Sequence, residues 1–183
     1  MRADFTPRDE FRHLLAALTP SNRLALETSL ATGLRISDVL NLKTSDLKER
    51  FSIKELKTGK KKSVRIPKVL LFRLKSISGR FFVFEHRFTH LKHKTRQAVY
   101  KDLKRVCHIF KIKNLQLSPH SARKIYAVLE YQKTHDLKKV CSLLNHDSEA
   151  VTMLYAMADN MVNRYAPKIK KGDEVHKVTS SLV

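Results

Sequence analysis

Cysteine is scarce in this chain, with two residues among 183. Cys107 and Cys141 lie far apart and form no Cys-x-x-Cys pair, and each falls at an apolar position of a helical pattern. Two cysteines allow one disulfide, but apolar positions favour two buried free thiols. This usage fits a reducing cytosol.

Long apolar runs are also absent. No stretch has the length needed to cross a bilayer, and no signal-peptide pattern is present. The chain shows neither an internal repeat nor a low-complexity linker. We therefore expect a cytoplasmic protein with no membrane partner, folded mainly as one compact domain.

Acidic residues are few, 17 against 37 lysines and arginines, and the formal net charge is +20. Such an excess predicts a polyanionic partner, most often nucleic acid, because neutralised phosphates release condensed counterions. The alternatives are a basic surface that is merely solvated and a contact with anionic lipid. No basic amphipathic anchor is evident, so we expect double-stranded DNA.

Helical spacing dominates the chain. The pattern predicts a helix capped by Thr6, another from Pro20 that ends at a left-handed Gly33, and a short one after it. Two β-like runs between Phe51 and Ile66 predict a hairpin with a basic turn at residues 57–60. Further helices are expected over 67–77, from Thr95, after Pro119 and around residues 151–157, with 137–144 ending at Asn145 and irregular or strand-like backbone at 81–84. The expected fold class is mainly α with a small antiparallel β-hairpin (α+β).

Three histidines, His86, His90 and His93, raise the question of a metal site. Their spacing would bring ligands together on a helix. Neighbouring Arg87 and Lys92 would repel a cation, and no cysteine lies nearby. We expect a basic DNA-facing loop here, with no metal and no cofactor.

A second set of basic residues lies on one face of the helix expected after Thr95. A charged face is usually only solvated, but the overall charge makes phosphate contact an equal alternative. The residues are Arg96, Lys101, Lys104 and Arg105.

The stretch 118–156 holds the residue types that suit chemistry on a phosphodiester. His120 and Arg123 are separated by three positions, which places them on one helix face. His146 and Tyr155 follow, nine positions apart. A cation, two imidazoles and a phenol are suggestive, although each has a structural alternative as a cap or a core residue.

Five segments in order resemble the tyrosine recombinase (phage integrase) family. ATGLRISDVLNLKTSDL, which contains Arg35, resembles its first signature, and PHSAR resembles its H-x-L-R box. LKTGK resembles the hairpin turn with the family's lysine, LNH its L-G-H, and TMLYA its nucleophile segment. The matches span about residues 6–166, nearly the whole chain.

The resemblance implies a tyrosine recombinase catalytic-domain fold and a metal-independent site. Arg35 and Arg123 would bind the phosphate, because guanidinium stays charged and forks onto two oxygens. His146 would add a donor, and Tyr155 would attack to give a covalent phosphotyrosine, while Tyr165 is a rival without the spacing. His120 is implied as the base. Lys57 is implied as the acid, with Lys60 as a rival.

Other basic residues are expected to bind DNA. They are Lys60, Lys61, Lys62, Arg96, Lys101, Lys104, Arg105 and Lys124.

Departures from the family pattern are few. Ala122 stands for a leucine, Lys124 for a histidine and Asn145 for a glycine, and none removes a catalytic group. The family's N-terminal core-binding domain is absent from this sequence, so the chain is either an excised catalytic domain or a minimal member. We expect residues 1–167 to be the catalytic domain and 168–183 a basic, mobile tail, with residues from Met161 onward available to dock on a neighbouring subunit.

The function expected from these features is site-specific DNA recombination by strand cleavage and rejoining, for integration, excision or inversion. A homo-oligomer on DNA is expected, with accessory DNA-bending proteins as further partners, in a prokaryotic or mobile-element setting. The alternatives are a catalytically silent DNA-binding regulator with the same fold and a type IB topoisomerase-like relaxing activity.

Overall fold

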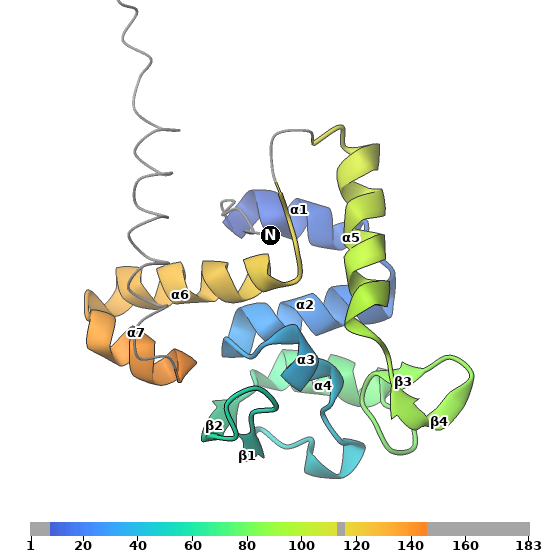
Figure 1. Cartoon of the computed structure of the whole chain (residues 1–183), viewed down its shortest axis with the longest axis horizontal. Helices are drawn as coiled ribbons and strands as arrows, with labels where there is room; N and C mark the ends of the chain where they lie inside the picture. Colours follow the sequence, from blue (N-terminus) through green and yellow to red (C-terminus); the bar gives the residue numbers. More distant parts are fainter. Residues whose placement is uncertain (1–7, 113–115, 146–183) are drawn as a thin grey trace, which may run out of the picture.

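The computed structural model describes residues 8–112 and 116–145, which form helices and two small antiparallel hairpins (Figure 1). This confirms the fold class expected from the sequence. In chain order the elements are α1 Arg8–Ala16, α2 Pro20–Thr32, α3 Ile36–Leu40, the 3-10 turn η1 Thr44–Asp46, β1 Arg50–Lys54, β2 Lys61–Arg65, α4 Lys68–Ile77, β3 Glu85–His86, β4 Thr89–His93, α5 Arg96–Ile109, α6 His120–Thr134 and α7 Leu137–Leu144.

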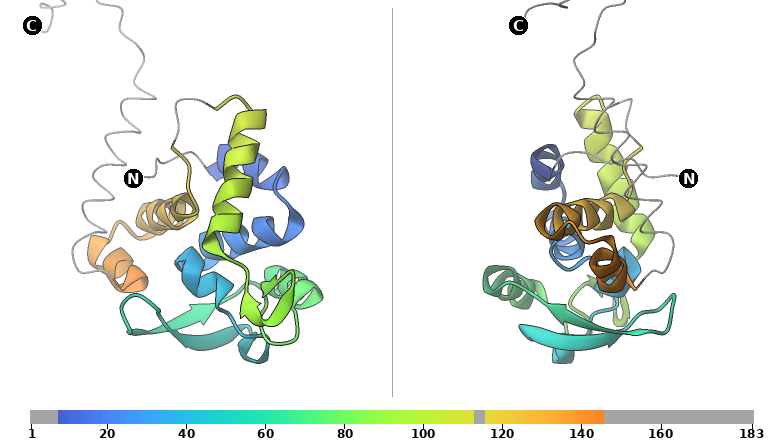
Figure 2. Two further views of the ribbon diagram at one scale, coloured as in Figure 1. Left: turned by 45° about the vertical axis from the view of Figure 1, so that its right-hand side comes forward. Right: turned by 90° about the vertical axis from the view of Figure 1, so that its left-hand side faces the viewer.

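Helix α2 is the centre of the core. It packs against α1, α3, α4 and α6, and its buried residues are spread around its circumference. A helix that is buried on most sides has neighbours on most sides. Figure 2 shows α5 crossing near one end of α2. Helix α6, from the second half of the chain, packs against α2, so α2 contacts elements from both halves of the chain.

The buried carboxylate of Asp102 joins α5 to the start of α2. Its Oδ2 accepts hydrogen bonds from Thr19 N, Thr19 Oγ1 and Asn22 Nδ2, at 2.8 to 3.0 Å, and its Oδ1 accepts from Arg105. Burial alone would raise the pKa of Asp102, but these hydrogen bonds outweigh burial and lower the pKa. The carboxylate therefore stays charged and holds the two helices in register.

The corner between α2 and α3 depends on Gly33. Its φ of 66° is left-handed, as the sequence predicted, and its N–H donates to Ser29 O at 2.9 Å. A Cβ at this position would lie 2.4 Å from the ring of Tyr126 on α6. Glycine is thus required both by the backbone and by the approach of α6.

The hairpin β1–β2 is antiparallel, with Arg50 opposite Arg65 and Lys54 opposite Lys61. The predicted turn at 57–60 lies inside a longer tip, residues 55–60. Glu55 N donates to Lys60 O, and Gly59 N donates to Glu55 O, which closes the tip. We call residues 55–60 the hairpin tip.

The segment with His86, His90 and His93 forms the hairpin β3–β4. The prediction of a loop here is wrong. Glu85 anchors it, because its carboxylate accepts from Arg80 N and pairs with His90. Within residues 8–112 and 116–145, no three His, Cys, Asp or Glu side chains are grouped to hold a metal ion. Before this hairpin, Val83 and Phe84 are buried in irregular backbone.

The C-terminal helices carry the expected caps and one unexpected break. Thr95 Oγ1 accepts from Ala98 N at the start of α5, and Asn145 ends α7 with a left-handed φ of 50°, both as predicted. The chain also leaves helix at His135, which is left-handed, and Asp136 caps α7. The break turns α7 back alongside α6 (Figure 1).

Both cysteines are free, Cys107 buried and Cys141 half-buried. No helix among the described residues combines the length and apolarity that crossing a membrane requires.

Candidate active site

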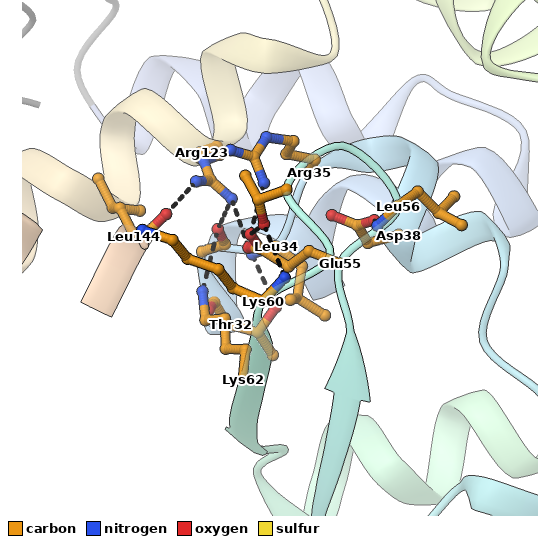
Figure 3. A network of polar contacts seen from close by, with 12 residues as sticks. Thr32, Leu34, Arg35, Asp38, Glu55, Leu56, Lys60, Lys62, Arg123 and Leu144 are labelled. Carbon is orange, nitrogen blue, oxygen red and sulfur yellow. Dashed lines mark hydrogen bonds and ion pairs between the residues drawn. The ribbon is translucent and has the colours of Figure 1, made fainter. Parts of the chain in front are cut away.

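Arg35 and Arg123 are brought to one place by the α2–α3 corner. Arg35 is the N-cap residue of α3, two positions after Gly33, and Arg123 lies in the first turn of α6. Arg123 Nη1 donates to Gly33 O and its Nη2 donates to Leu144 O, each at 2.7 Å (Figure 3). Arg123 therefore joins the end of α2 to the end of α7.

A buried carboxylate, Glu55, faces both arginines. Arg35 Nη1 lies 2.8 Å from Glu55 Oε2, and Arg123 Nη1 lies 3.9 Å from Glu55 Oε1. The side chains of Arg35 and Arg123 are 7% and 5% exposed and that of Glu55 is 0% exposed. Burial alone would raise the pKa of Glu55. The hydrogen bonds from Thr58 and Arg35, together with the charges of the two arginines, lower the pKa instead.

Lys62 of β2 is part of the same cluster. Its Nζ donates to Thr32 O at 3.3 Å and to Gly33 O at 3.5 Å, the carbonyl that Arg123 also binds. Burial, and then the charge of Arg123, lowers the pKa of Lys62 to about 8. The expectation that Lys62 lies on a DNA-facing surface is not met, because the side chain is buried on the inner face of the hairpin with Val64.

Asp38 of α3 binds the backbone of the hairpin tip. Its Oδ1 accepts a hydrogen bond from Leu56 N at 2.9 Å. Burial raises the pKa of this carboxyl, and the hydrogen bond from Leu56 opposes the rise. The contact fixes the residue that precedes Lys57, which is itself exposed on the tip.

His120 begins α6, in the same turn as Arg123. His120 is exposed to solvent, yet partial desolvation by neighbouring atoms lowers its pKa, and the charges of Arg96, Arg123, Arg35 and Lys124 lower it further. The imidazole is therefore neutral at neutral pH, which is the form that accepts a proton.

The expected DNA-binding residues differ in exposure. Lys60, Lys61, Arg96 and Lys101 are exposed, and Lys104 and Lys124 are half-buried. Arg105 is exposed as well, but its guanidinium is paired with Asp102 and Ala17 O.

His146 and Tyr155, with the rival Tyr165, lie outside the described residues. Tyr126 lies near the site, against Gly33, but burial and then the charge of Glu130 raise its pKa to about 12. A phenol that resists ionisation is a poor nucleophile, so Tyr126 is a packing residue.

Two residues of this cluster, Glu55 and Asp38, were missed from the sequence. A signal existed for Glu55. Phe51 and Ile53 alternate along β1, and Glu55 follows at the next alternate position, which puts a carboxylate on the apolar face of the hairpin. Asp38 lies three positions after Arg35, the N-cap residue of α3, so the two lie on one face.

The cluster has the chemistry of an anion site. Two guanidiniums that stay charged at every physiological pH face the two oxygens of one carboxylate. A phosphodiester presents two oxygens and one charge in a similar way. Neutral His120 stands next to this site at the start of α6.

Comparison with known proteins finds relatives of this chain. The chain is 31% identical over 163 residues to a tyrosine recombinase of Thermosipho africanus, an alignment that covers 83% of this chain and 56% of that protein. Among solved structures, it superposes with a TM-score of 0.69 on the XerH site-specific recombinase in a post-cleavage complex with its palindromic difH substrate, at 22% identity, covering 88% of this chain and 51% of that one. With a lambda integrase tetramer bound to a Holliday junction the TM-score is 0.68, at 23% identity, covering 81% of this chain and 48% of that one.

The chain thus spans about half the length of the Thermosipho recombinase and of these two structures. The family model described as the phage integrase family matches residues 4–161, which hold the hairpin tip, both arginines, His146 and Tyr155. With most of the chain inside that match, the protein belongs to the phage integrase family.

Proposed function

We propose that this chain carries the catalytic machinery of a site-specific DNA recombinase, which cleaves and rejoins DNA strands through a 3′-phosphotyrosine. The observation that carries the proposal is the convergence of Arg35 and Arg123 on one buried anion position, occupied by Glu55. The Thermosipho relative is named a tyrosine recombinase, and the XerH structure holds its DNA substrate after cleavage.

In the proposed reaction the arginines bind the scissile phosphate and stabilise the charge that develops on it. The Tyr155 oxygen attacks phosphorus, and its proton passes to neutral His120. The bond from phosphorus to the 5′ oxygen breaks, and Lys57 protonates that oxygen. Attack of a 5′ hydroxyl on the phosphotyrosine reverses these steps and rejoins the strand without external energy.

Double-stranded DNA is the proposed partner. The proposed setting is the cytoplasm of a prokaryotic cell, with the protein encoded by the cell, a phage or a mobile element. The exposed Lys60, Lys61, Arg96 and Lys101 supply charge for phosphate contacts. We also propose an oligomer on DNA, with residues 1–167 as the catalytic domain, because lambda integrase has been solved as a tetramer on a Holliday junction.

The test is capture of a covalent adduct on a pool of nicked duplexes of randomised sequence, followed by sequencing of the attached DNA. Wild type should form the adduct, and Tyr155→Phe should not. Arg35→Ala should lose about 100-fold or more in rate, because one donor to the developing charge is removed.

Arg65→Ala is the matched control, since Arg65 lies on β2 with a side chain that is 68% exposed. It removes the same charge far from the anion position. An adduct in Tyr155→Phe would exclude Tyr155 as nucleophile. DNA binding without any adduct would favour the silent regulator, and relaxation of supercoils without sequence preference would favour a topoisomerase-like activity.

A further inference from the structure

The anion position between the two arginines is filled by a side chain of the protein itself. Glu55 places one oxygen 2.8 Å from Arg35 Nη1 and the other 3.9 Å from Arg123 Nη1. A carboxylate and a phosphodiester each offer two oxygens and one negative charge to such a pair. Both arginine side chains are almost fully buried in this arrangement, beside Glu55 (Figure 3).

Glu55 belongs to the hairpin tip, most of which is exposed. It is the first residue of the hairpin tip, after β1 ends at Lys54 and before β2 begins at Lys61. The tip is held to the arginines through Glu55 and to α3 through the hydrogen bond from Leu56 N to Asp38. Apart from the buried Glu55 and the half-buried Thr58, its residues are exposed, which leaves few contacts to break on lifting.

We propose that Glu55 is an internal competitor of the scissile phosphate, which closes the arginine site in the absence of DNA and must leave when a phosphate binds. The inference rests on the proposed function, because it takes the arginine pair as the phosphate site.

Two charges drive the exchange. The phosphate replaces Glu55 on the arginines, so that their charges remain compensated throughout. At the same time DNA attracts the exposed Lys57 and Lys60 of the tip. The displacement that opens the site therefore also carries Lys57, the proposed acid, toward the DNA. Until then the competitor holds the site closed against other anions.

Thr58 keeps Glu55 in place. Its Oγ1 donates to Glu55 Oε2 at 2.7 Å, the same oxygen that Arg35 contacts. This hydrogen bond joins Thr58 to Glu55 alone. A substitution of Thr58 therefore weakens the hold on Glu55 and leaves both arginines unchanged.

The experiment measures the affinity of a short fluorescent duplex at fixed salt for Glu55→Gln and for the control Glu49→Gln. Glu49 lies just before β1, pairs only loosely with Arg65 at 3.6 Å, and loses the same charge. If Glu55 closes the site roughly nine-tenths of the time, Glu55→Gln binds about tenfold more tightly than Glu49→Gln. In an Arg35→Ala background this gain should disappear, because the competitor then has no arginine pair to release.

Equal affinity of Glu55→Gln and Glu49→Gln would overturn the proposal, as would a slower adduct rate in Glu55→Gln, which would make Glu55 a support for Arg35. If thermal melting shows that Glu55→Gln is unfolded, the DNA affinities of Thr58→Val and Thr58→Ser are compared instead. Only Thr58→Val removes the hydroxyl, and it should bind more tightly than Thr58→Ser. Equal binding of that pair rejects the competitor.

The two proposals fail separately. A wild-type chain that forms no adduct on any substrate contradicts the recombinase chemistry, while the affinity comparison still decides the role of Glu55. An adduct in wild type without a gain in Glu55→Gln contradicts the competitor alone.

Discussion

Buried charges at the site are each compensated, and this determines what the individual residues can do. Arg123 gives two hydrogen bonds to backbone carbonyls, and Arg35 pairs with Glu55. A buried charge without such partners would cost several kcal/mol. The compensation leaves an environment that is positive enough to lower the pKa of both His120 and Lys62, although burial is the larger cause for each.

His120 should remain able to accept a proton at a lower pH than an ordinary histidine does. Burial and the nearby cations lower its pKa from 6.5, so the acid limb of the pH–rate profile for adduct formation should lie below pH 6.5. Arg96→Gln removes the charge that contributes most to this lowering, and should move the limb to higher pH.

Lys101→Gln is the control, since it removes an exposed charge from the same helix. Both variants lose DNA contacts and slow the reaction, but only the position of the limb reports the histidine. A limb in the same place for wild type and Arg96→Gln would show that His120 is not the group that titrates.

Lys62 should reduce stability below pH 8. Its pKa is about 8 in the folded protein and 10.5 as a free side chain, so the unfolded chain binds more protons between these values. The free energy of unfolding should therefore rise between pH 8 and 10.5, by about 3 kcal/mol from this group.

Lys62→Met lacks this titration, so the difference in unfolding free energy between wild type and Lys62→Met isolates it from other lysines. Urea melts at several pH values measure it. If the difference in unfolding free energy stays constant from pH 7.5 to 10.5, the pKa of Lys62 is not lowered by burial.

At the scale of elements, the site depends on how closely α6 approaches the end of α2. The ring of Tyr126 occupies the space beside Gly33 where other residues carry a Cβ. The same approach brings Arg123 within 2.7 Å of Gly33 O. The position of Arg123 is thus set by a helix contact that only glycine permits.

Gly33→Ala should cost roughly 3 kcal/mol of unfolding free energy, because it adds left-handed strain and a clash with Tyr126. Gly59→Ala separates the two causes. Gly59 has the same φ of 66°, but its Cβ would meet only Lys54 Cε at 3.8 Å. Thermal or urea melts should show a loss of about 1 kcal/mol for Gly59→Ala. Equal losses for the two variants would mean that α6 does not pack against Gly33.

At the scale of the whole molecule, a charge of +20 on 183 residues gives a long-range attraction for DNA that is separate from the site. Lys62 contributes little to direct phosphate contact, because its side chain is buried and bound to backbone carbonyls of α2 and Gly33. The guanidinium of Arg105 is half exposed but already paired with Asp102, so it is less available to a phosphate. Exposed lysines on the hairpin tip and at the start of β2 remain to make such contacts.

DNA binding should therefore weaken steeply with salt, and Lys60→Ala and Lys61→Ala should each reduce the slope of log affinity against log salt by about 0.9. Fluorescence anisotropy across a salt series measures this slope. Lys133→Ala is the control, because Lys133 already pairs with Glu130 at the end of α6. A full slope in both hairpin variants would place the DNA on another face.

Local patterns were sufficient where the physics is local. Gly33, Thr95 and Asn145 were predicted at helix ends because a left-handed φ or a side-chain cap involves only neighbouring residues. The segment 86–93 was misjudged because its strand pairing depends on Glu85 binding Arg80 N and His90, which no periodicity shows. The break at His135 also escaped detection.

The sequence by itself determined the helical fold, the family resemblance and the pair Arg35 and Arg123, since spacing and motif context carry these. Only the tertiary structure decided that Glu55 fills the position between the arginines and that Lys62 is buried against the end of α2. Both depend on how the hairpin packs against α2 and α6, and that packing joins segments far apart in the chain. Charge in a sequence indicates attraction to phosphate, but burial and partners decide which charges a phosphate can reach.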